Sequence, residues 1–254
     1  MPAACQKEGI VAVHDHPHGL DGPELPPIVT IAIERMDGGP ALVIEDATQL
    51  AWDFFTRDAS SVGRYAFDAR VGRTDPDRIV TADLVAINTT MRARSPHTAW
   101  AAFLDTPEPL SWLARLGTRT RLFAIEDDDW QARWGAALGD AITTLIGPYR
   151  NLSVATKVLH AKRPALFPVL DRLVVEQLGG INRTPGEVLG HVREVGRANA
   201  SGLMAIAATL DKVEIARSEV RILDALLWSS HPASSLPFAT ATWQRRMVPL
   251  SGPG

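Results

Sequence analysis

Cysteine is almost absent from this chain of 254 residues, in which Cys5 is the only one. A single thiol cannot form a disulfide within the chain, and it excludes zinc and iron–sulfur sites built from cysteines. Apolar runs long enough to span a membrane are also missing, and residues 1–27 lack the charged start and apolar stretch of a secretory signal. We therefore expect a protein of the reducing cytoplasm that makes no membrane contact.

An excess of positive charge is missing as well: 26 Lys and Arg stand against 29 Asp and Glu, for a formal net charge of −3. A protein that coats nucleic acid non-specifically needs a broad excess of cations, so that class is excluded, although a local basic patch is not. The sequence has no glycine-rich phosphate loop, no dinucleotide fingerprint and no convincing triad of metal ligands. We expect no cofactor and no bound metal.

Large apolar side chains are scarce in residues 1–27, which end in the proline-rich "PHGLDGPELPP". Such a segment buries too little surface to offset its ordering entropy and is predicted to be a disordered tail. His14, His16 and His18 lie close together in it. They favour a flexible polar tail over a metal-binding tract, because no scaffold of other ligands fixes their geometry. Residues 247–254 are predicted as a flexible C-terminal tail, which leaves residues 28–246 as a single domain.

Apolar residues in that domain recur mostly at helical spacing, which predicts a mainly α fold. The exception is "IVTIAIERMDGGPALVIED", whose alternating β-branched residues and Asp37-Gly38-Gly39 predict a small β element near residues 28–44. Helix starts are indicated by Thr81, by the capping box Thr184-Pro185-Gly186-Glu187 and by Ser218. The segments with helical spacing are "DATQLAWDFFTR", "TADLVAINTTM", "SPHTAWAAFL", "PLSWLARL", "DDWQARWGAALGDAITTLI", "SGLMAIAATLDKV" and "SEVRILDALLW".

Several charged or aromatic residues are more typical of structure than of chemistry. Asp224 lies inside an apolar helical pattern, which indicates a carboxylate paired with an arginine. The acidic run Glu126–Asp129 is typical of a solvated helix start rather than a metal site. Asp83 falls in the first turn of its predicted helix, where the dipole favours an anion. The tryptophans at helix-face spacing are expected in the core, namely Trp52, Trp112, Trp130, Trp134 and Trp228.

The segment "NLSVATKVLHAKRPALFPVLDRLVVEQLGG", residues 151–180, predicts a helix, a basic turn with proline, and a second helix. Asp171 stands just before the second helix, so it is either an N-cap or a carboxylate with a chemical role. Between residues 149 and 198 there are eight Lys and Arg against four acidic residues. The cluster at the end of the first helix is either a phosphate-binding face or a set of cations placed favourably at a helix C-terminus. It comprises Lys157, His160, Lys162 and Arg163.

Three stretches, "YAFDARVGRTDPDRIVTADLVAI", "VATKVLHAKRPALFPVLDRLV" and "VRILDALLW", together resemble the domain-of-unknown-function family numbered 6308. The resemblance covers roughly residues 45–229 in order, and "KRPALFPVLD" is its most specific part. That family is found mostly in actinomycete bacteria. Membership implies a helical fold and no established activity.

The stretch "SVATKVLHAKRPALFPVLDRLV" is more remotely similar to the helix-hairpin-helix DNA glycosylases. The resemblance places Asp171 on their catalytic aspartate and Ser153, eighteen positions earlier, where bifunctional members carry a Schiff-base lysine. It implies a glycosylase-like core and a monofunctional hydrolase of N-glycosidic bonds acting on DNA or a nucleotide. Asp171 would stabilise the oxocarbenium-like charge as the base departs.

The glycosylase hairpin carries two glycines whose backbone N–H groups hold a DNA phosphate, and "GPYRNLS" places Tyr149 and Asn151 at those positions. Asn151 adopts a left-handed conformation more readily than Tyr149. The resemblance assigns to the substrate or phosphate site Tyr149, Asn151, Ser153, Lys157, Lys162 and Arg163. The alternative is a non-catalytic interaction or structural protein in which Asp171 only caps its helix.

Overall fold

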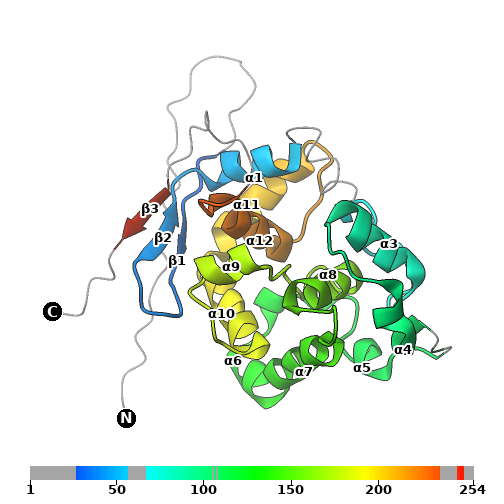
Figure 1. Cartoon of the computed structure of the whole chain (residues 1–254). Coiled ribbons are helices and arrows are strands. Elements are labelled where there is room, and N and C mark those ends of the chain that lie inside the picture. Colours follow the sequence, from blue (N-terminus) through cyan, green and yellow to red (C-terminus); the bar gives the residue numbers. More distant parts are fainter. Residues whose placement is uncertain (1–26, 57–66, 105, 107, 235–244, 249–254) are drawn as a thin grey trace, which may run out of the picture.

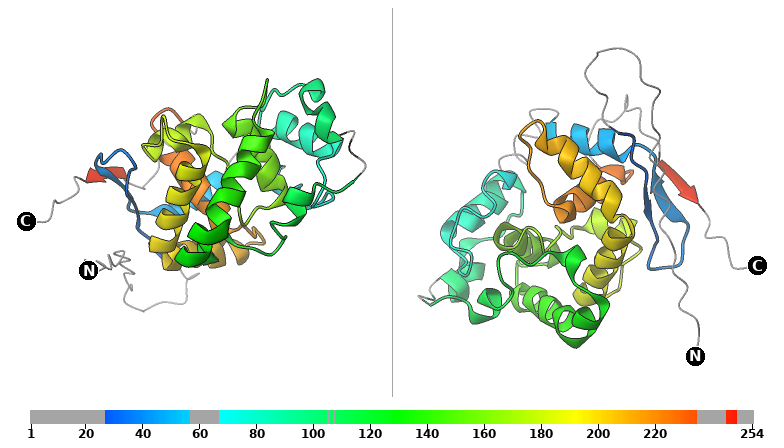
Figure 2. Two further views of the ribbon diagram at one scale, coloured as in Figure 1. Left: turned by 90° about the horizontal axis from the view of Figure 1, so that it is seen from below. Right: turned by 180° about the vertical axis from the view of Figure 1, so that it is seen from behind.

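A computed structural model of the chain describes residues 27–56, 67–104, 106, 108–234 and 245–248 (Figure 1). In these residues helices dominate, and one small sheet lies at the side of the helical body (Figures 1 and 2). The prediction of a mainly α fold is confirmed. None of the helices in the described ranges combines the length and the apolar composition that crossing a bilayer requires. His14, His16 and His18 lie outside the described residues.

The helices follow the segments that apolar spacing predicts. The α-helices are α1 (Ala47–Thr56), α3 (Thr81–Thr90), α4 (Ala101–Leu104), α5 (Ser111–Ala114), α6 (Asp127–Asp129), α7 (Gly135–Leu145), α8 (Leu152–Lys162), α9 (Arg172–Gln177), α10 (Pro185–Ala198), α11 (Ala200–Asp211) and α12 (Glu219–Ser230). Short 3₁₀ helices are η1 (His97–Trp100) and η2 (Leu122–Ala124). The π-helical turn η3 (Trp130–Trp134) joins α6 to α7, so the acidic run begins one continuous helical segment.

The predicted β element is an antiparallel hairpin of β1 (Ile31–Ile33) and β2 (Ala41–Ile44), in which Ile31 pairs with Ile44. Gly38 takes a φ of 71° in the turn, a conformation that glycine adopts at little cost. A third strand that the sequence did not indicate, β3 (Arg245–Val248), pairs with β2 on its other side. It extends past the domain boundary expected at residue 246.

Asn199, between α10 and α11, joins the sheet to the helices. Its side-chain amide donates to the Ala32 carbonyl (2.8 Å), and its oxygen accepts from the Ala32 N–H (3.2 Å). Ala32 lies on β1, an outer strand of the sheet order β1-β2-β3. The backbone groups of that strand edge are therefore paired with the helical body.

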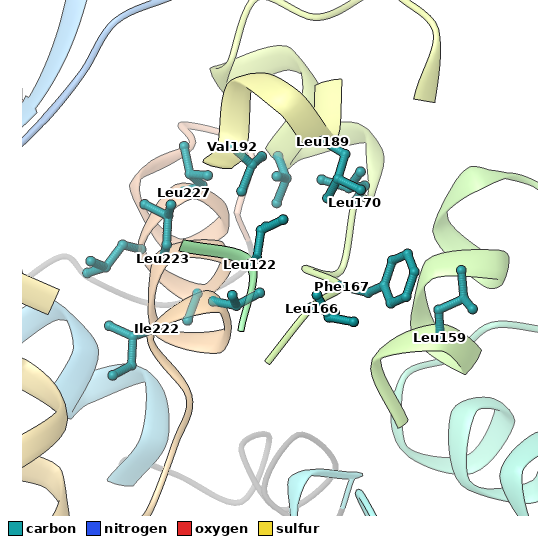
Figure 3. Close-up of a cluster of buried hydrophobic side chains, with 14 of the residues drawn as sticks. Leu122, Leu159, Leu166, Phe167, Leu170, Leu189, Val192, Ile222, Leu223 and Leu227 are labelled. Atoms are coloured by element: carbon teal, nitrogen blue, oxygen red, sulfur yellow. The ribbon is translucent and has the colours of Figure 1, made fainter. Parts of the chain in front are cut away.

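The turn between α8 and α9 supplies much of the core. Leu166 and Phe167 are fully buried, and Leu170 is nearly so. Figure 3 shows Phe167 beside Leu159 of α8, while the labelled side chains from outside α8 and this turn come from η2, α10 and α12. The apolar part of "KRPALFPVLD" is therefore used for packing. The five expected tryptophans pack against the core but stay partly exposed, whereas Trp100 is fully buried.

Helix starts agree with the sequence at two of three positions. Thr184 and Glu187 form the capping box of α10, and Ser218 accepts from the Arg221 N–H at the start of α12. The prediction of Thr81 as an N-cap is wrong, because Thr81 is already helical and Val80 precedes the helix. The Asp83 carboxylate, in the first turn, instead accepts from the Val80 N–H (2.8 Å). It therefore pairs a backbone N–H at the helix start that has no acceptor within the helix.

Candidate functional site

The chain reverses between α7 and α8, which pack against each other (Figure 1). Gly147 and Arg150 close the turn with two backbone hydrogen bonds of 2.9 Å. Tyr149 takes the left-handed conformation with φ 61°, whereas Asn151 is extended and caps α8 by accepting from the Val154 N–H (3.0 Å). The expected order of preference is therefore reversed. A left-handed conformation costs a residue with a side chain roughly 1–2 kcal/mol, so other contacts must hold Tyr149 there.

Ser95 supplies such a contact. Its hydroxyl donates to the Tyr149 carbonyl (3.1 Å) and accepts from the Trp100 indole N–H (2.8 Å). The Asn88 amide in turn holds the Ser95 backbone through two hydrogen bonds of 2.8 and 2.9 Å. Residues 91–95 and 146–151, which we call the loop pair, are therefore fastened to each other and to α3.

The loop pair presents cations and one aromatic ring. Arg92 and Arg94 also have left-handed backbones (φ 50° and 53°), and both are exposed. Neither side chain has a hydrogen bond or an ion pair with any described residue. Tyr149 is 76% exposed, and the sequence of the two loops contains no acidic residue. This surface is positively charged and preorganised.

Arg150, which also belongs to the loop pair, is partly buried. Its guanidinium stacks over Trp100 (5.4 Å) and Phe103 (5.0 Å). Its Nε and Nη1 are buried without a hydrogen-bond acceptor among the described residues. Cation–π contacts of this kind stabilise a desolvated arginine by up to about 2 kcal/mol. Arg150 therefore adds positive charge to the loop pair, and its guanidinium contacts aromatic rings in place of acidic groups.

Asp171 is the N-cap of α9. Its Oδ1 accepts from the Val174 N–H (3.1 Å). Burial raises the pKa of Asp171, while the Val174 N–H, the Lys157 ammonium, the Leu173 N–H and the Trp228 side chain each lower it. The Asp171 side chain is half-buried, and its carboxylate interacts with several groups inside the chain. Asp171 is also next to α8, because the Leu170 N–H donates to the Thr156 hydroxyl (3.0 Å).

Lys157 connects Asp171 to the loop pair. Its ammonium is buried, donates to the Met91 carbonyl (3.1 Å) and interacts electrostatically with Asp171. Burial lowers the pKa of Lys157, and Asp171 counteracts that shift. Ser153 lies one helical turn earlier on α8 and is partly buried. Four of the predicted site residues therefore lie in or next to the first two turns of α8, namely Tyr149, Ser153, Lys157 and Asp171.

Lys162 and Arg163 lie at the other end of α8, and both are buried. Lys162 Nζ donates to Asp83 Oδ2 (2.6 Å), Thr74 Oγ1 (2.6 Å) and the Asp75 carbonyl (2.8 Å). Arg163 pairs with Asp77 (2.5 Å) and donates to the carbonyls of Pro76 and Leu113. All of these contacts are made inside the chain, and neither side chain faces solvent.

His160, the fourth member of the basic cluster, is also buried. Its Nδ1 donates to the Phe167 carbonyl (2.6 Å). Burial lowers the pKa of His160 to about 4. The imidazole is therefore neutral near pH 7 and adds no positive charge to this end of the helix.

Asp224 is paired with an arginine, as the sequence predicts. Arg221 binds Asp224 (2.6 Å) and Asp68 (2.9 Å), and the Val169 N–H donates to Asp224 (3.0 Å). All three charged side chains are buried. Asp68, which sequence reasoning did not single out, completes the network. This arrangement joins α12 to the α8–α9 turn and leaves the carboxylates no open side.

A pocket of about 520 Å³ lies between residues 67–74, α3 and the end of α8. Asp171 and the loop pair do not line it. The sequence did not indicate a pocket there. Across the described residues, no group of three or more His, Cys, Asp or Glu is placed to hold a metal ion.

The fold and the site define a mainly helical protein with buried ion pairs and a rigid basic surface. The chain belongs to the family of unknown function DUF6308, whose model matches residues 47–231. This confirms the resemblance that the three sequence stretches indicate. No curated protein matches the chain, and no solved structure matches it.

Proposed function

We propose that the protein binds DNA through the loop pair, with Arg92, Arg94 and Tyr149 as its contacts. The observation that carries the proposal is the exposure of two guanidinium groups, without partners among the described residues, and of an aromatic ring on loops fixed by Ser95 and Asn88. Guanidinium groups form bidentate hydrogen bonds with phosphates, and aromatic rings stack on bases. The sequence resemblance to the glycosylases also assigns Tyr149 to a position at which those enzymes contact a DNA phosphate.

The strained backbone supports this proposal. Of the five described residues other than glycine with a positive φ, three lie in the loop pair, namely Arg92, Arg94 and Tyr149. Strain of this kind is retained where it positions groups for binding. Loops fixed in advance lose less entropy when a ligand binds, so a few contacts suffice for measurable affinity.

The charge distribution limits the strength of binding. The whole chain carries a formal charge of −3, so contacts should be confined to the loop pair. If Arg92 and Arg94 each neutralise one phosphate, log K should fall with log salt concentration with a slope of about −1.8. We therefore expect weak DNA binding, with an affinity that depends on the geometry of the loop pair.

Fluorescence anisotropy with a labelled mixed-sequence duplex in a potassium chloride series tests the proposal. Arg92→Gln/Arg94→Gln should weaken binding by roughly tenfold or more and flatten the salt slope. The control is Arg133→Gln/Arg183→Gln, which removes the same charge from exposed positions outside the loop pair. If both double variants lose the same DNA affinity, the effect is due to net charge and not to the loop pair. The absence of salt-dependent binding by the wild type would exclude the proposal.

A second candidate is hydrolysis of an N-glycosidic bond by Asp171. It is favoured by the position of Asp171, which is only half-buried and is linked through Lys157 to the loop pair. The carboxylate would stabilise the oxocarbenium-like charge while water completes hydrolysis. Ser153 has no amine, so no imine with DNA would form and no strand scission would follow.

Release of bases from oligonucleotides that each carry one damaged or mismatched base tests this second candidate. Asp171→Asn keeps a side chain that caps helices well but removes the charge, so activity should vanish while the variant stays folded. If the wild-type protein binds these oligonucleotides and releases no base, hydrolysis is excluded and only DNA binding remains as a function. The protein would then be a non-catalytic DNA-binding module.

A further inference from the structure

The pocket beside α3 combines apolar walls with cations. Its lining consists of Phe67, Arg70, Val71, Arg73, Thr74, Thr81, Ala82, Asp83, Val85, Ala86 and Ala161. Its volume of about 520 Å³ falls within the range of roughly 300–1,000 Å³ typical of small-molecule sites. None of its residues belongs to the loop pair, so its occupant need not be a nucleic acid.

Most of the wall is apolar. Phe67 is fully buried and stacks on His160, with ring centroids 5.9 Å apart. Ala86 on α3 and Ala161 on α8 are also buried, whereas Val85 is 48% exposed. Water beside such surfaces is displaced favourably by an apolar ligand. The pocket therefore suits a molecule with a hydrocarbon body.

The Asp83 carboxylate in the pocket wall is already paired. Lys162 uses its three protons on Asp83, Thr74 and the Asp75 carbonyl. The Asp83 carboxylate also accepts from the Thr74 hydroxyl (2.6 Å) and the Val80 N–H. This network is neutral overall and rigid. The polar group of a ligand must therefore be recognised elsewhere in the pocket.

Arg70 and Arg73 provide that recognition. Both are exposed, and neither side chain has a hydrogen bond or ion pair in the part of the chain that the structure describes. Backbone hydrogen bonds from Arg70 and Val71 to the Phe67 carbonyl, and from Arg73 to the Arg70 carbonyl, fold this segment into turns. A further bond from the Gly72 N–H to the Ala161 carbonyl (3.0 Å) fixes the segment against α8. The backbone of both arginines is thus fixed beside the apolar walls, and both residues line the pocket.

We propose that this pocket binds a small amphipathic carboxylate, with its hydrocarbon body against Val85 and Ala86 and its carboxylate on Arg70 and Arg73. Arginine and carboxylate form charge-assisted bonds, frequently in pairs. A simple phosphate would use the arginines but not the apolar wall. An uncharged alcohol would use the wall but not the arginines. The pocket requires both parts in one molecule.

Calorimetric titration with decanoate, below its micelle concentration, tests the proposal. Wild-type protein should bind one equivalent, and decanol or inorganic phosphate should each bind at least about tenfold more weakly. Arg70→Gln/Arg73→Gln should lose a similar factor for decanoate and nothing for decanol. Because both arginines are exposed, this variant should fold.

Filling the pocket provides an independent variant. Ala82 is exposed and lines the pocket, so Ala82→Trp should block decanoate without disturbing the core. Ala136→Trp is the control, because Ala136 is exposed on α7 and does not line the pocket. The proposal is overturned if decanoate does not bind, if it binds both pocket variants as it binds the wild type, or if phosphate binds equally well. None of these results depends on whether DNA binds the loop pair.

Discussion

The two ends of α8 carry charge of the same sign and use it in opposite ways. At the C-terminal end, Lys162 and Arg163 are buried and every strong contact is made inside the chain. At the N-terminal end, the loop pair holds Arg92 and Arg94 in solvent without partners among the described residues. A buried cation loses its hydration and persists only when it is paired. Only the exposed end can offer its charge to a ligand.

This difference has an experimental consequence. Substitutions at the buried end should reduce the free energy of unfolding and leave DNA affinity unchanged in the folded protein. Substitutions in the loop pair should do the reverse. A variant that violates this separation would break the comparison.

The largest effect is expected from Lys162→Met, which leaves the Asp83 carboxylate buried without its cation. Losing one partner of a buried ion pair costs about 3–5 kcal/mol, and urea denaturation measures the change. The control is Lys212→Met, because Lys212 is exposed at the end of α11. Lys162→Met/Asp83→Leu should recover part of the loss. A decrease below about 1 kcal/mol for Lys162→Met would mean that the pair is not sealed from water.

The second effect sharpens the same comparison through pH. Burial lowers the pKa of His160 to about 4 in the folded protein, whereas an unfolded histidine has a pKa of about 6.5. Between these values the unfolded chain binds the proton and the folded chain does not, so stability falls as the pH falls. The full loss at pH 4 and below is about 3 kcal/mol; it is absent above pH 7.

His160→Asn isolates this contribution, because the asparagine amide can donate to the Phe167 carbonyl but does not titrate. The difference in unfolding free energy between wild type and variant should shrink as the pH is lowered from 7 to 4.5. A difference that stays constant with pH would show that water or an anion reaches the imidazole. The carboxylates titrate in both proteins and cancel in the comparison.

The third effect concerns Asp171, which lies between the two ends of α8. Asp171→Ala removes the cap of α9 and should cost about 1 kcal/mol more than Asp171→Asn, because asparagine also caps helices. Thermal unfolding of the two variants measures the difference. Asn151→Ala, which removes the cap of α8, provides the reference for a cap without a charge. If Asp171→Ala and Asp171→Asn lose the same amount, the charge of Asp171 beside Lys157 matters and the cap does not.

Features set by neighbouring residues could be predicted from the sequence. The helices, the β1–β2 hairpin and the caps Asp171, Thr184 and Ser218 depend on residues within a few positions. The environment of Lys162 depends on Asp83, which lies on another helix. The strand β3 depends equally on a distant partner, β2. Local patterns contain no information about such contacts.

The candidate site shows the same limit. The sequence indicated Tyr149 because of its place in the hairpin. Its left-handed backbone, however, depends on Ser95, 54 residues earlier in the chain. Arg92 and Arg94 were missed because the sequence near them contains only a weak sign of a binding loop. An Arg-x-Arg pair following a helix that ends near Met91 was the available signal.

The smallest change in stability is expected from Tyr149→Gly, which also tests the exposed end most directly. Glycine takes the left-handed conformation at no steric cost, but it raises the entropy of the unfolded chain. The two effects oppose each other, so the free energy of unfolding should stay equal or rise by less than about 1 kcal/mol. DNA affinity should nevertheless fall about tenfold, because stacking on an aromatic ring contributes about 1–3 kcal/mol per base. Tyr149→Phe, which keeps the ring and the strain, should bind like the wild type. A glycine variant that is clearly less stable would show that the Tyr149 ring packs against the chain, and one that binds DNA as well as the wild type would confine the contact to Arg92 and Arg94.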